Sequence, residues 1–372
     1  MKRIIKDAEA YDLTTNILES MQDMVRVIDQ EGNVIFMNKT MREKFGDLIG
    51  KKCYEAIDRT DRCVDCISER SLRIFEPHEK EERLGDRIYS VISSPILSQS
   101  TQKVFSVEVF RDITDQKLLE KSIFDQYSKM KVDLNFAKQL QRKIIPEDAI
   151  YGDAIRVISK YEPSEALGGD IFDIIEIDED NIGIYIADVS GHGVSASMFT
   201  LFLRQIMRNK KNKSKNIEET IDDLIYNFKE LNVDPETYFT VLYGIYNKPT
   251  QEITFVNAGH NCYPIIITGN NELKEIDING FPICSLIDRS MHNSIKIKLN
   301  KGDRVLFYTD GLVESYDAKS NTFFGYEGLF KALEKNIKEK SEVLISNIYD
   351  EAIRYSSEFI KDDIAVVLFE II

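Results

Sequence analysis

The sequence contains no apolar run long enough to cross a bilayer, which takes about 20 consecutive residues in a helix. Its first residues, MKRIIKDAEAYD, also lack the apolar core of a secretory signal peptide. These two absences predict a cytoplasmic protein without a membrane span.

Positive charge is scarce as well, since 48 Lys and Arg residues stand against 63 Asp and Glu residues, for a net charge of −15. A surface of that sign repels phosphate backbones and anionic lipid headgroups. We therefore expect neither nucleic acid nor a membrane surface as the main partner. Tryptophan is absent, and the five cysteines do not suggest a disulfide framework in a reducing compartment.

Histidine is rare, with four residues in the chain, and this narrows the catalytic schemes. The turn GHGVSAS at 191–197 is not the G-x-S-x-G elbow of a serine hydrolase. No G-x-x-x-x-G-K-[ST] phosphate-binding loop occurs. Hydrolysis by a Ser-His-Asp triad and P-loop nucleotide hydrolysis both fit poorly.

The N-terminal part has the pattern of a small sensor domain. Two short β-rich runs flank a turn at 30–33, short polar helices follow, and RIYSVISSPIL and KVFSVEVFRDIT then alternate as two half-buried strands. The expected order is β-β-α-α-β-β. The spacing Asp29-x-x-Gly32-x-x-x-x-x-Asn38 and the closing FRDITDQK resemble a PAS domain over residues 12–115.

Residues 115–145 contain neither Gly nor Pro, and Pro146 ends this run. Apolar residues recur there at alternating spacings of four and three, the seam of a heptad pattern: Ile123, Tyr127, Met130, Leu134 and Ala137. One interpretation is a single amphipathic helix lying on a domain. The other is a parallel coiled coil that makes a homodimer and joins the sensor to an effector.

The remainder, from 147 to 372, alternates strands and helices without internal repeats. Strands outnumber helices and cluster in meanders, which favours two antiparallel sheets flanked by helices. The fold class expected for the whole chain is α+β.

Four acidic clusters occur in this second half, at strand ends or turns. They are LGGDIFD (167–173), ADVSGHG (187–193), YTDGLVES (308–315) and KDDIAVV (361–367). Turn chemistry alone explains any single cluster, because turns favour Asp and Gly. Asp188 and Asp310, however, follow the most apolar strands, and carboxylates that meet at the edge of a core repel one another. Two Mn²⁺ or Mg²⁺ ions would remove this repulsion and could activate a water against a phosphoryl group.

The motifs GGDIFD, ADVSGHGVSASM, VNAGHNCYP, LFYTDGLVES and DDIAVVL occur in this order. Together with the preceding FAKQLQRKIIP, they resemble the SpoIIE/RsbU-type serine phosphatases, a bacterial branch of the metal-dependent PPM superfamily, over residues 136–372. The resemblance implies an αββα sandwich, two Mn²⁺ or Mg²⁺ ions and hydrolysis of phosphoserine or phosphothreonine on a protein.

The same resemblance implies roles for individual residues. Asp188 would bridge both metals, with the Val189 carbonyl as a further ligand, and Asp170 would bind through water. Asp310 and the pair Asp362–Asp363 would bind the second metal, with Asp362 favoured over its neighbour. Asp188 and Asp310 are the residues expected to be essential for catalysis, because the metals they hold supply the nucleophile.

Glycines, histidines and arginines of this second half can also be given expected roles. Gly191, Gly193 and Gly259 resemble glycines at points of close approach. His192 is expected to have a turn role rather than to act as a general acid, and His260 to be a hydrogen-bonded core histidine. Two arginines are candidates for a phosphate clamp: Arg156 and Arg204.

Three cysteines lie close together in the sensor, Cys53 and the C-x-x-C pair Cys63 and Cys66. With a fourth ligand from His78 or from a partner chain they could bind Zn²⁺ or an iron–sulfur cluster. They could also form a redox pair, or simply be reduced thiols.

We therefore expect a PAS sensor (12–115), a signalling helix (116–146) and a phosphatase domain (147–372). The sensor would act through the helix on the metal-binding loops. The expected substrate is a phosphorylated regulatory protein, by resemblance an anti-sigma-factor antagonist of the STAS type. The alternatives are an inactive pseudo-phosphatase that only binds and a hydrolase of small phosphate esters.

Overall fold

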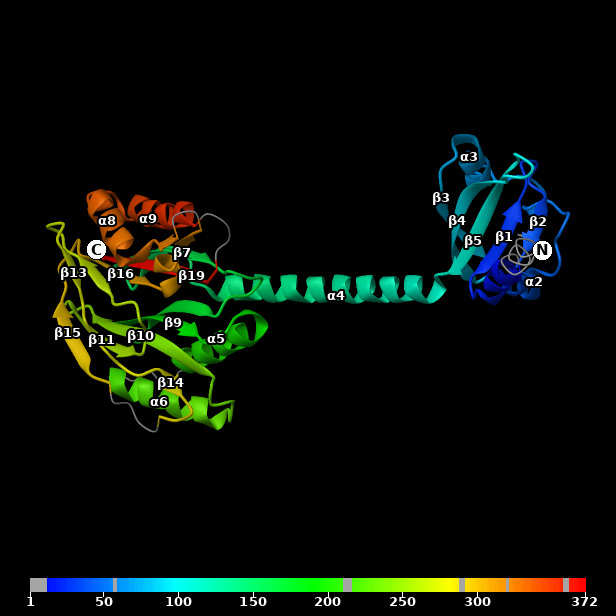
Figure 1. Ribbon diagram of the computed structural model, residues 1–372. Helices are drawn as coiled ribbons and strands as arrows, with labels where there is room; N and C mark the ends of the chain where they lie inside the picture. Colours follow the sequence, from blue (N-terminus) through cyan, green and yellow to red (C-terminus); the bar gives the residue numbers. More distant parts are fainter. Residues whose placement is uncertain (1–11, 56–58, 210–215, 288–291, 319–320, 357–360) are drawn as a thin grey trace. The chain divides into compact units, whose positions relative to one another are not determined.

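The computed structural model describes residues 12–55, 59–209, 216–287, 292–318, 321–356 and 361–372. The chain divides into two compact units, which we call the first unit (residues 1–130) and the second unit (residues 131–372). Each is described by itself below, with the element labels of Figure 1.

The first unit is built on a five-stranded antiparallel sheet with the strand order β2-β1-β5-β4-β3. The strands are β1 (Met24–Ile28), β2 (Val34–Met37), β3 (His78–Leu84), β4 (Arg87–Leu97) and β5 (Val104–Asp112). Helix α2 (Lys39–Phe45) packs against β1, and α3 (Ile67–Ile74) packs against β3, β4 and β5. One small core fills the space between them, formed by side chains such as Met24, Ile28, Met37, Met41 and Phe110.

The polar residues of the predicted PAS motif organise the first turns of this unit. Asp29 Oδ1 accepts a hydrogen bond from the Asn33 backbone N–H at 2.7 Å and closes the β1–β2 hairpin. Asn38 Oδ1 accepts from the N–H groups of Val25 at 3.0 Å and Met41 at 3.1 Å. One amide therefore joins β1 to the first turn of α2, and the predicted hairpin is confirmed.

Strand β3 is absent from the sequence-based order β-β-α-α-β-β. Its residues, HEKEERL, carry mainly charged side chains and do not read as a strand. The strand lies at the edge of the sheet and pairs only with β4 there, so its outward-facing charges remain in water.

Helix α4 (Thr114–Ile144) is 31 residues long and lies in the segment for which a signalling helix is predicted, 116–146. Its heptad residues Ile123, Tyr127 and Met130 are 56%, 65% and 61% exposed in the single chain. An apolar seam of this kind gains stability only when another surface covers it.

The second unit contains two larger antiparallel sheets and a short hairpin. The first sheet has the order β15-β11-β10-β9-β8 with β14 paired to β10, and the second has the order β13-β12-β16-β19-β7-β6. The first consists of β8 (Asp170–Glu176), β9 (Asn181–Val189), β10 (Tyr238–Asn247), β11 (Glu252–Ala258), β14 (Ile283–Cys284) and β15 (Ser294–Lys298). The second consists of β6 (Ala149–Tyr151), β7 (Ile155–Glu162), β12 (Ile265–Ile267), β13 (Leu273–Glu275), β16 (Arg304–Tyr308) and β19 (Ile364–Ile371). The hairpin is β17 (Tyr316–Asp317) with β18 (Thr322–Phe323).

Helices cover the outer faces of the two sheets (Figure 1). Helices α5 (Gly193–Arg208) and α6 (Ile217–Glu230) cover the first sheet, while α8 (Gly325–Asn336) and α9 (Ser341–Tyr355) cover the second. Between the sheets lies an inner core with residues from both, among them Phe172, Ile186, Phe307 and Val367. The predicted αββα sandwich is therefore confirmed.

The sequence of strand β9, NIGIYIADV, is almost continuously apolar, and the position of the strand explains this. Ile184 and Ile186 face the inner core, whereas Tyr185 and Ala187 face helices α5 and α6. Both faces of the strand are buried, so the polar residues usual on one face of an antiparallel strand are missing. The first carboxylate after this run is Asp188, which lies where β9 leaves the core.

Candidate active site

The first two carboxylates of the site lie opposite each other on neighbouring strands. Asp170 opens β8 and pairs in register with Asp188 near the end of β9. Asp170 is 2% exposed, and its Oδ2 has no hydrogen-bond partner among the described residues. Burial, followed by the charge of Asp188, raises the pKa of Asp170 well above its ordinary value. Burial, followed by the charge of Asp310, raises the pKa of Asp188 to about 7.

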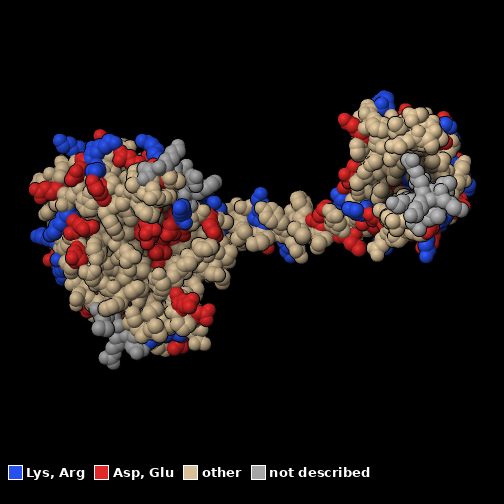
Figure 2. Space-filling view, in the orientation of Figure 1, with Lys and Arg blue, Asp and Glu red and all other residues tan. Residues whose placement is uncertain are grey.

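Two further carboxylates reach the site from the second sheet. Asp310 follows β16 and begins the short helix α7 (Asp310–Val313), and Asp362 stands two residues before β19. Burial raises the pKa of Asp362 to about 6, and the charges of Asp310 and Asp363 act in the same direction. Figure 2 shows acidic side chains gathered on the second unit near β19. The structure thus brings together acids from all four predicted clusters.

Asp363 has a different task from its neighbour. Its Oδ1 accepts from the backbone N–H of Ser164 at 2.7 Å and from the hydroxyl of Ser164 at 2.9 Å. Its Oδ2 accepts from the N–H groups of Gly169 at 2.5 Å and Asp170 at 3.4 Å. Both oxygens are therefore used to hold the loop at residues 164–170, which carries Asp170.

Glycine is required in that loop because the chain passes close to other groups. A Cβ atom on Gly168 would lie 2.4 Å from the Tyr161 hydroxyl, and one on Gly169 would lie 2.9 Å from the Val189 carbonyl oxygen. Only residues without side chains allow the loop to lie against the end of β9. The Val189 carbonyl, predicted as a ligand, is thus adjacent to the loop that carries Asp170.

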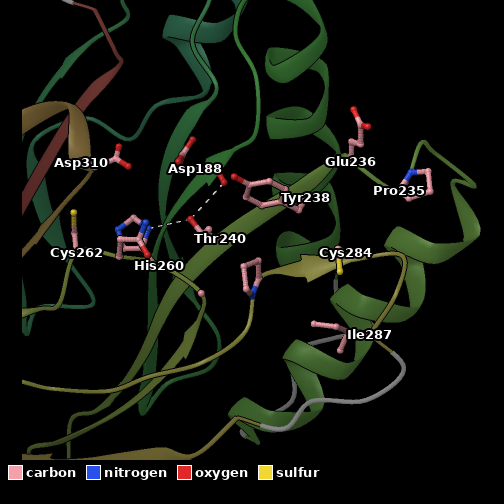
Figure 3. Close-up of a pocket in the computed structure, with 13 residues that line it drawn as sticks. Asp188, Pro235, Glu236, Tyr238, Thr240, His260, Cys262, Cys284, Ile287 and Asp310 are labelled. Atoms are coloured by element: carbon pink, nitrogen blue, oxygen red, sulfur yellow. Dashed lines mark hydrogen bonds between the residues drawn. The ribbon is translucent and has the colours of Figure 1, made fainter. Parts of the chain in front are cut away.

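His260 is a buried, hydrogen-bonded residue, as predicted. Its Nε2 lies 2.9 Å from the Tyr308 carbonyl oxygen and donates to it, so Nδ1 accepts from the Thr240 hydroxyl at 3.1 Å (Figure 3). Burial lowers the pKa of His260, which keeps the ring neutral. Since Thr240 pairs in register with Asp188, this bond fixes the strand next to the site.

His192 lies at the turn that follows β9, at the N-cap of α5. Its side chain is 79% exposed, and Nδ1 lies 3.0 Å from Glu165 Oε1. The flanking residues Gly191 and Gly193 have φ angles of 95° and 73°, which favour glycine. These observations agree with the predicted turn role.

The structure places both candidates for a phosphate clamp, Arg156 and Arg204, beside carboxylates outside the candidate site. Arg204 Nε lies 3.2 Å from Oδ2 of the buried Asp173, so this guanidinium neutralises a core carboxylate. Arg156 lies 3.7 Å from Glu370 and lines a cavity that contains none of the site carboxylates. The sequence could not show this, because both arginines belong to strands or helices whose facing direction depends on packing.

A cavity of about 560 Å³ opens beside the carboxylates. Asp188, Asp310 and His260 line one end, and Tyr238 and Ile287 line the other (Figure 3). No Lys or Arg is found among the described residues that line it. A phosphate group in this cavity would therefore depend on bound cations for charge neutralisation.

Sequence reasoning missed a contact between the linker helix and the site. Gln141, near the end of α4, is 4% exposed. Its Nε2 donates to the Gly168 carbonyl at 2.7 Å, and its Oε1 accepts from the Gly168 N–H at 3.1 Å. In the sequence, Gln141 is one of several polar residues of the FAKQLQRKIIP segment. A polar residue in a helix is equally compatible with an exposed position, so the sequence did not predict this contact.

The sensor cysteines do not form a metal site in the structure. Cys53, Cys63 and Cys66 are all free thiols and line the same small cavity. Over the described ranges, no group of three His, Cys, Asp or Glu side chains is placed to hold a metal ion. Neither the sensor thiols nor the described carboxylates of the second unit form such a group of three.

The comparisons with known proteins agree with this fold. The family model described as Stage II sporulation protein E (SpoIIE) matches residues 178–372, and the PAS fold model matches residues 18–118. The chain belongs to the SpoIIE family and carries a PAS fold ahead of it. Its enzyme class is that of the protein serine/threonine phosphatases.

Individual relatives are distant. The phosphoserine phosphatase RsbU of Bacillus subtilis is 21% identical over 239 residues, which cover 64% of this chain and 70% of RsbU. The phosphoserine phosphatase RsbP of the same organism is 26% identical over 187 residues, or 50% of this chain and 46% of RsbP. The structure of the SiaA-PP2C domain of Pseudomonas aeruginosa has a TM-score of 0.57 at 18% identity, covering 66% of this chain and 98% of that domain.

No helix in the described part of the chain is long and apolar enough to cross a membrane.

Proposed function

We propose that this protein is a PAS-regulated, metal-dependent phosphatase that removes phosphate from serine or threonine in a regulatory phosphoprotein. The observation that carries the proposal is the meeting of Asp170, Asp188, Asp310 and Asp362 at the sheet ends. Burial, and after it the charges of the neighbouring carboxylates, raises the pKa values of Asp170, Asp188 and Asp362. Such a group is unfavourable in a folded chain unless positive charge balances it.

The residues present fit a pair of divalent cations. The Asp170 Oδ2 atom is buried without a hydrogen-bond partner among the described residues, and a metal-bound water would satisfy it. Mg²⁺ commonly keeps several waters, so part of its coordination shell need not come from side chains. When bound, two such ions supply an activated water and neutralise phosphoryl oxygens.

We assign the ligands as follows. Asp188 would hold both ions, with the Val189 carbonyl as a further ligand. Asp310 and Asp362 would hold the second ion, and Asp170 would bind through water. The hydrogen bonds of Asp363 to Ser164 and to the loop support Asp362 as the ligand of that pair. Either Mn²⁺ or Mg²⁺ satisfies this all-oxygen donor set.

The chain's own residues position the reaction. Thr240 and the neutral His260 fix the strand that carries Asp188. Asp363 and Gln141 fix the loop that carries Asp170. The opposite wall of the cavity, with Pro235, Tyr238 and Ile287, is available for the residues that flank a phosphoserine.

The substrate we propose is an anti-sigma-factor antagonist of the STAS type. The similarity to RsbU, which is named as a phosphoserine phosphatase, supports this choice. We further propose that the exposed heptad seam of α4 forms a parallel dimer, in which the sensor acts on the Asp170 loop through Gln141.

The test uses the purified full chain with Mn²⁺ and two substrates, a phosphoserine peptide and a nucleoside monophosphate. We expect hydrolysis of the peptide, with kcat/KM at least about 100-fold lower in Asp188→Asn, because loss of a direct ligand costs at least as much as loss of its supporting shell. The control is Asp86→Asn, an exposed aspartate in the first unit. Full activity in Asp188→Asn would overturn the site, and activity on the nucleotide alone would overturn the substrate class. No manganese-dependent turnover on either substrate would indicate a protein that only binds.

A further inference from the structure

The first unit brings three thiols from two chain segments to one place. Cys53 follows α2, whereas Cys63 and Cys66 come shortly before α3. All three line two small cavities of about 20 Å³ and about 40 Å³, which also share Tyr54 and Ser68. Sites for organic cofactors measure about 300–1,000 Å³, so these spaces admit little more than water.

Cys63 is the thiol that an outside reagent can reach. Besides the two small cavities, it lines an open surface depression of about 700 Å³ with Arg59 and Glu82. Its Sγ accepts a hydrogen bond from Arg59 Nη1 at 3.2 Å, while Arg59 Nη2 donates to Glu82 Oε1. Arg59 therefore gives Cys63 a charged hydrogen-bond donor, which can stabilise the negative charge that develops on the sulfur as it reacts.

Cys66 stands three residues further on, at the N-cap of α3. Its Sγ accepts from the Glu69 N–H at 3.5 Å, at the positive end of the helix. Cys53 differs from this pair, because burial raises the pKa of its thiol and keeps it protonated. The two partly exposed cysteines of the C-x-x-C pair are therefore the ones suited to react with each other.

We propose that Cys63 and Cys66 form a reversible dithiol–disulfide pair that reacts with peroxide. In the first step the Cys63 sulfur attacks one peroxide oxygen, the O–O bond breaks, and water leaves as Cys63 becomes a sulfenic acid. In the second step the Cys66 sulfur attacks the Cys63 sulfur, an S–S bond forms, and the sulfenic oxygen leaves as a second water. Two thiols and one hydrogen peroxide thus give one disulfide and two waters.

A thiol reductant reverses the reaction. The proposal concerns the first unit and does not depend on the phosphatase activity of the second. It differs from a zinc site, for which the described residues show no converging group of three ligands.

The experiment treats the full chain, freed of reductant and assayed for metals, with increasing hydrogen peroxide. We expect two of the five thiols to be lost per chain and a Cys63–Cys66 disulfide to appear in peptide mass spectra. Dithiothreitol should restore both thiols. A different intrachain pair, only intermolecular disulfides, or a stoichiometric metal that protects the thiols would overturn the proposal.

Three variants make the order of steps testable. In Cys66→Ser, a sulfenic acid should persist and be trapped by dimedone at residue 63. In Arg59→Gln, the second-order rate with peroxide should fall roughly tenfold, because the Cys63 sulfur loses its hydrogen bond from a charged donor. Cys284→Ser removes a cysteine of the second unit and should leave the loss of two thiols unchanged. An Arg59→Gln rate equal to that of the unaltered chain would contradict the role given to Cys63.

Discussion

Gln141 of the linker helix exchanges two hydrogen bonds with the backbone of Gly168, one through each atom of its side-chain amide. Gly168 stands two residues before Asp170, whose buried Oδ2 has no hydrogen-bond partner in the described part of the chain. A rotation or shift of α4 would therefore move the loop that supplies one carboxylate of the proposed metal centre. This gives the helix a direct physical connection to catalysis.

Removing this connection should reduce activity more than stability. We expect Gln141→Ala to lower kcat by about 10- to 100-fold and to raise the Mn²⁺ concentration for half-maximal activity, as loss of a supporting hydrogen bond does at other metal sites. The matched control is Gln139→Ala, an exposed glutamine on the same helix. Equal manganese titration curves for Gln141→Ala and the control would refute a positioning role.

The neighbouring aspartates Asp362 and Asp363 should separate into a ligand and a structural residue. We expect Asp362→Asn to abolish the rise in melting temperature on adding Mn²⁺ while leaving the metal-free protein stable. Asp363→Ala should instead lower the metal-free free energy of unfolding by about 1–3 kcal/mol, because buried N–H groups lose their acceptor. Differential scanning fluorimetry with and without Mn²⁺ distinguishes the two, and an exchange of these phenotypes would reverse our assignment.

Asp188 should make the metal-free protein less stable as the pH rises. Its pKa is about 7 in the folded chain, and burial is the main cause. An unfolded aspartate has a pKa of about 3.9, so the folded state holds the proton more tightly. The resulting stabilisation is complete below about pH 4 and is lost between about pH 4 and about pH 7.

Urea unfolding in the presence of a chelator measures this effect. We expect the unaltered chain to be less stable at about pH 7.5 than at about pH 5.5, and Asp188→Asn to reduce that difference. Asp86→Asn is the control, because its side chain is exposed. A pH difference of the same size in Asp188→Asn would show that other groups cause it.

The heptad seam of α4 predicts an effect on assembly. Met130→Lys places a charge in the seam, so we expect the dimer to dissociate at concentrations where the unaltered chain stays dimeric. Val132→Lys introduces the same charge at an exposed position outside the seam. Light scattering during size-exclusion chromatography gives the mass of each, and a monomeric unaltered chain would rule out the coiled coil.

Sequence patterns were sufficient for the sandwich, because buried strands such as β9 are apolar on both faces. Sequence patterns did not predict the role of a side chain whose hydrogen-bond or ion-pair partner lies far away in the sequence. Nothing near Arg204 shows that it faces Asp173, and nothing near Asp363 shows that it binds a loop about 200 residues earlier. Strand β3 was missed because an edge strand keeps its charged residues in water.

Strand β19 lies in the middle of its sheet, between β16 and β7, although it follows every other strand in the chain. During synthesis, β16 and β7 therefore have no strand between them until β19 has been made. Until then, the Asp170 loop also lacks the hydrogen bonds that the Asp363 carboxylate accepts. A nascent or truncated polypeptide that stops before residue 362 would therefore have no phosphatase activity and would expose surface that chaperones recognise.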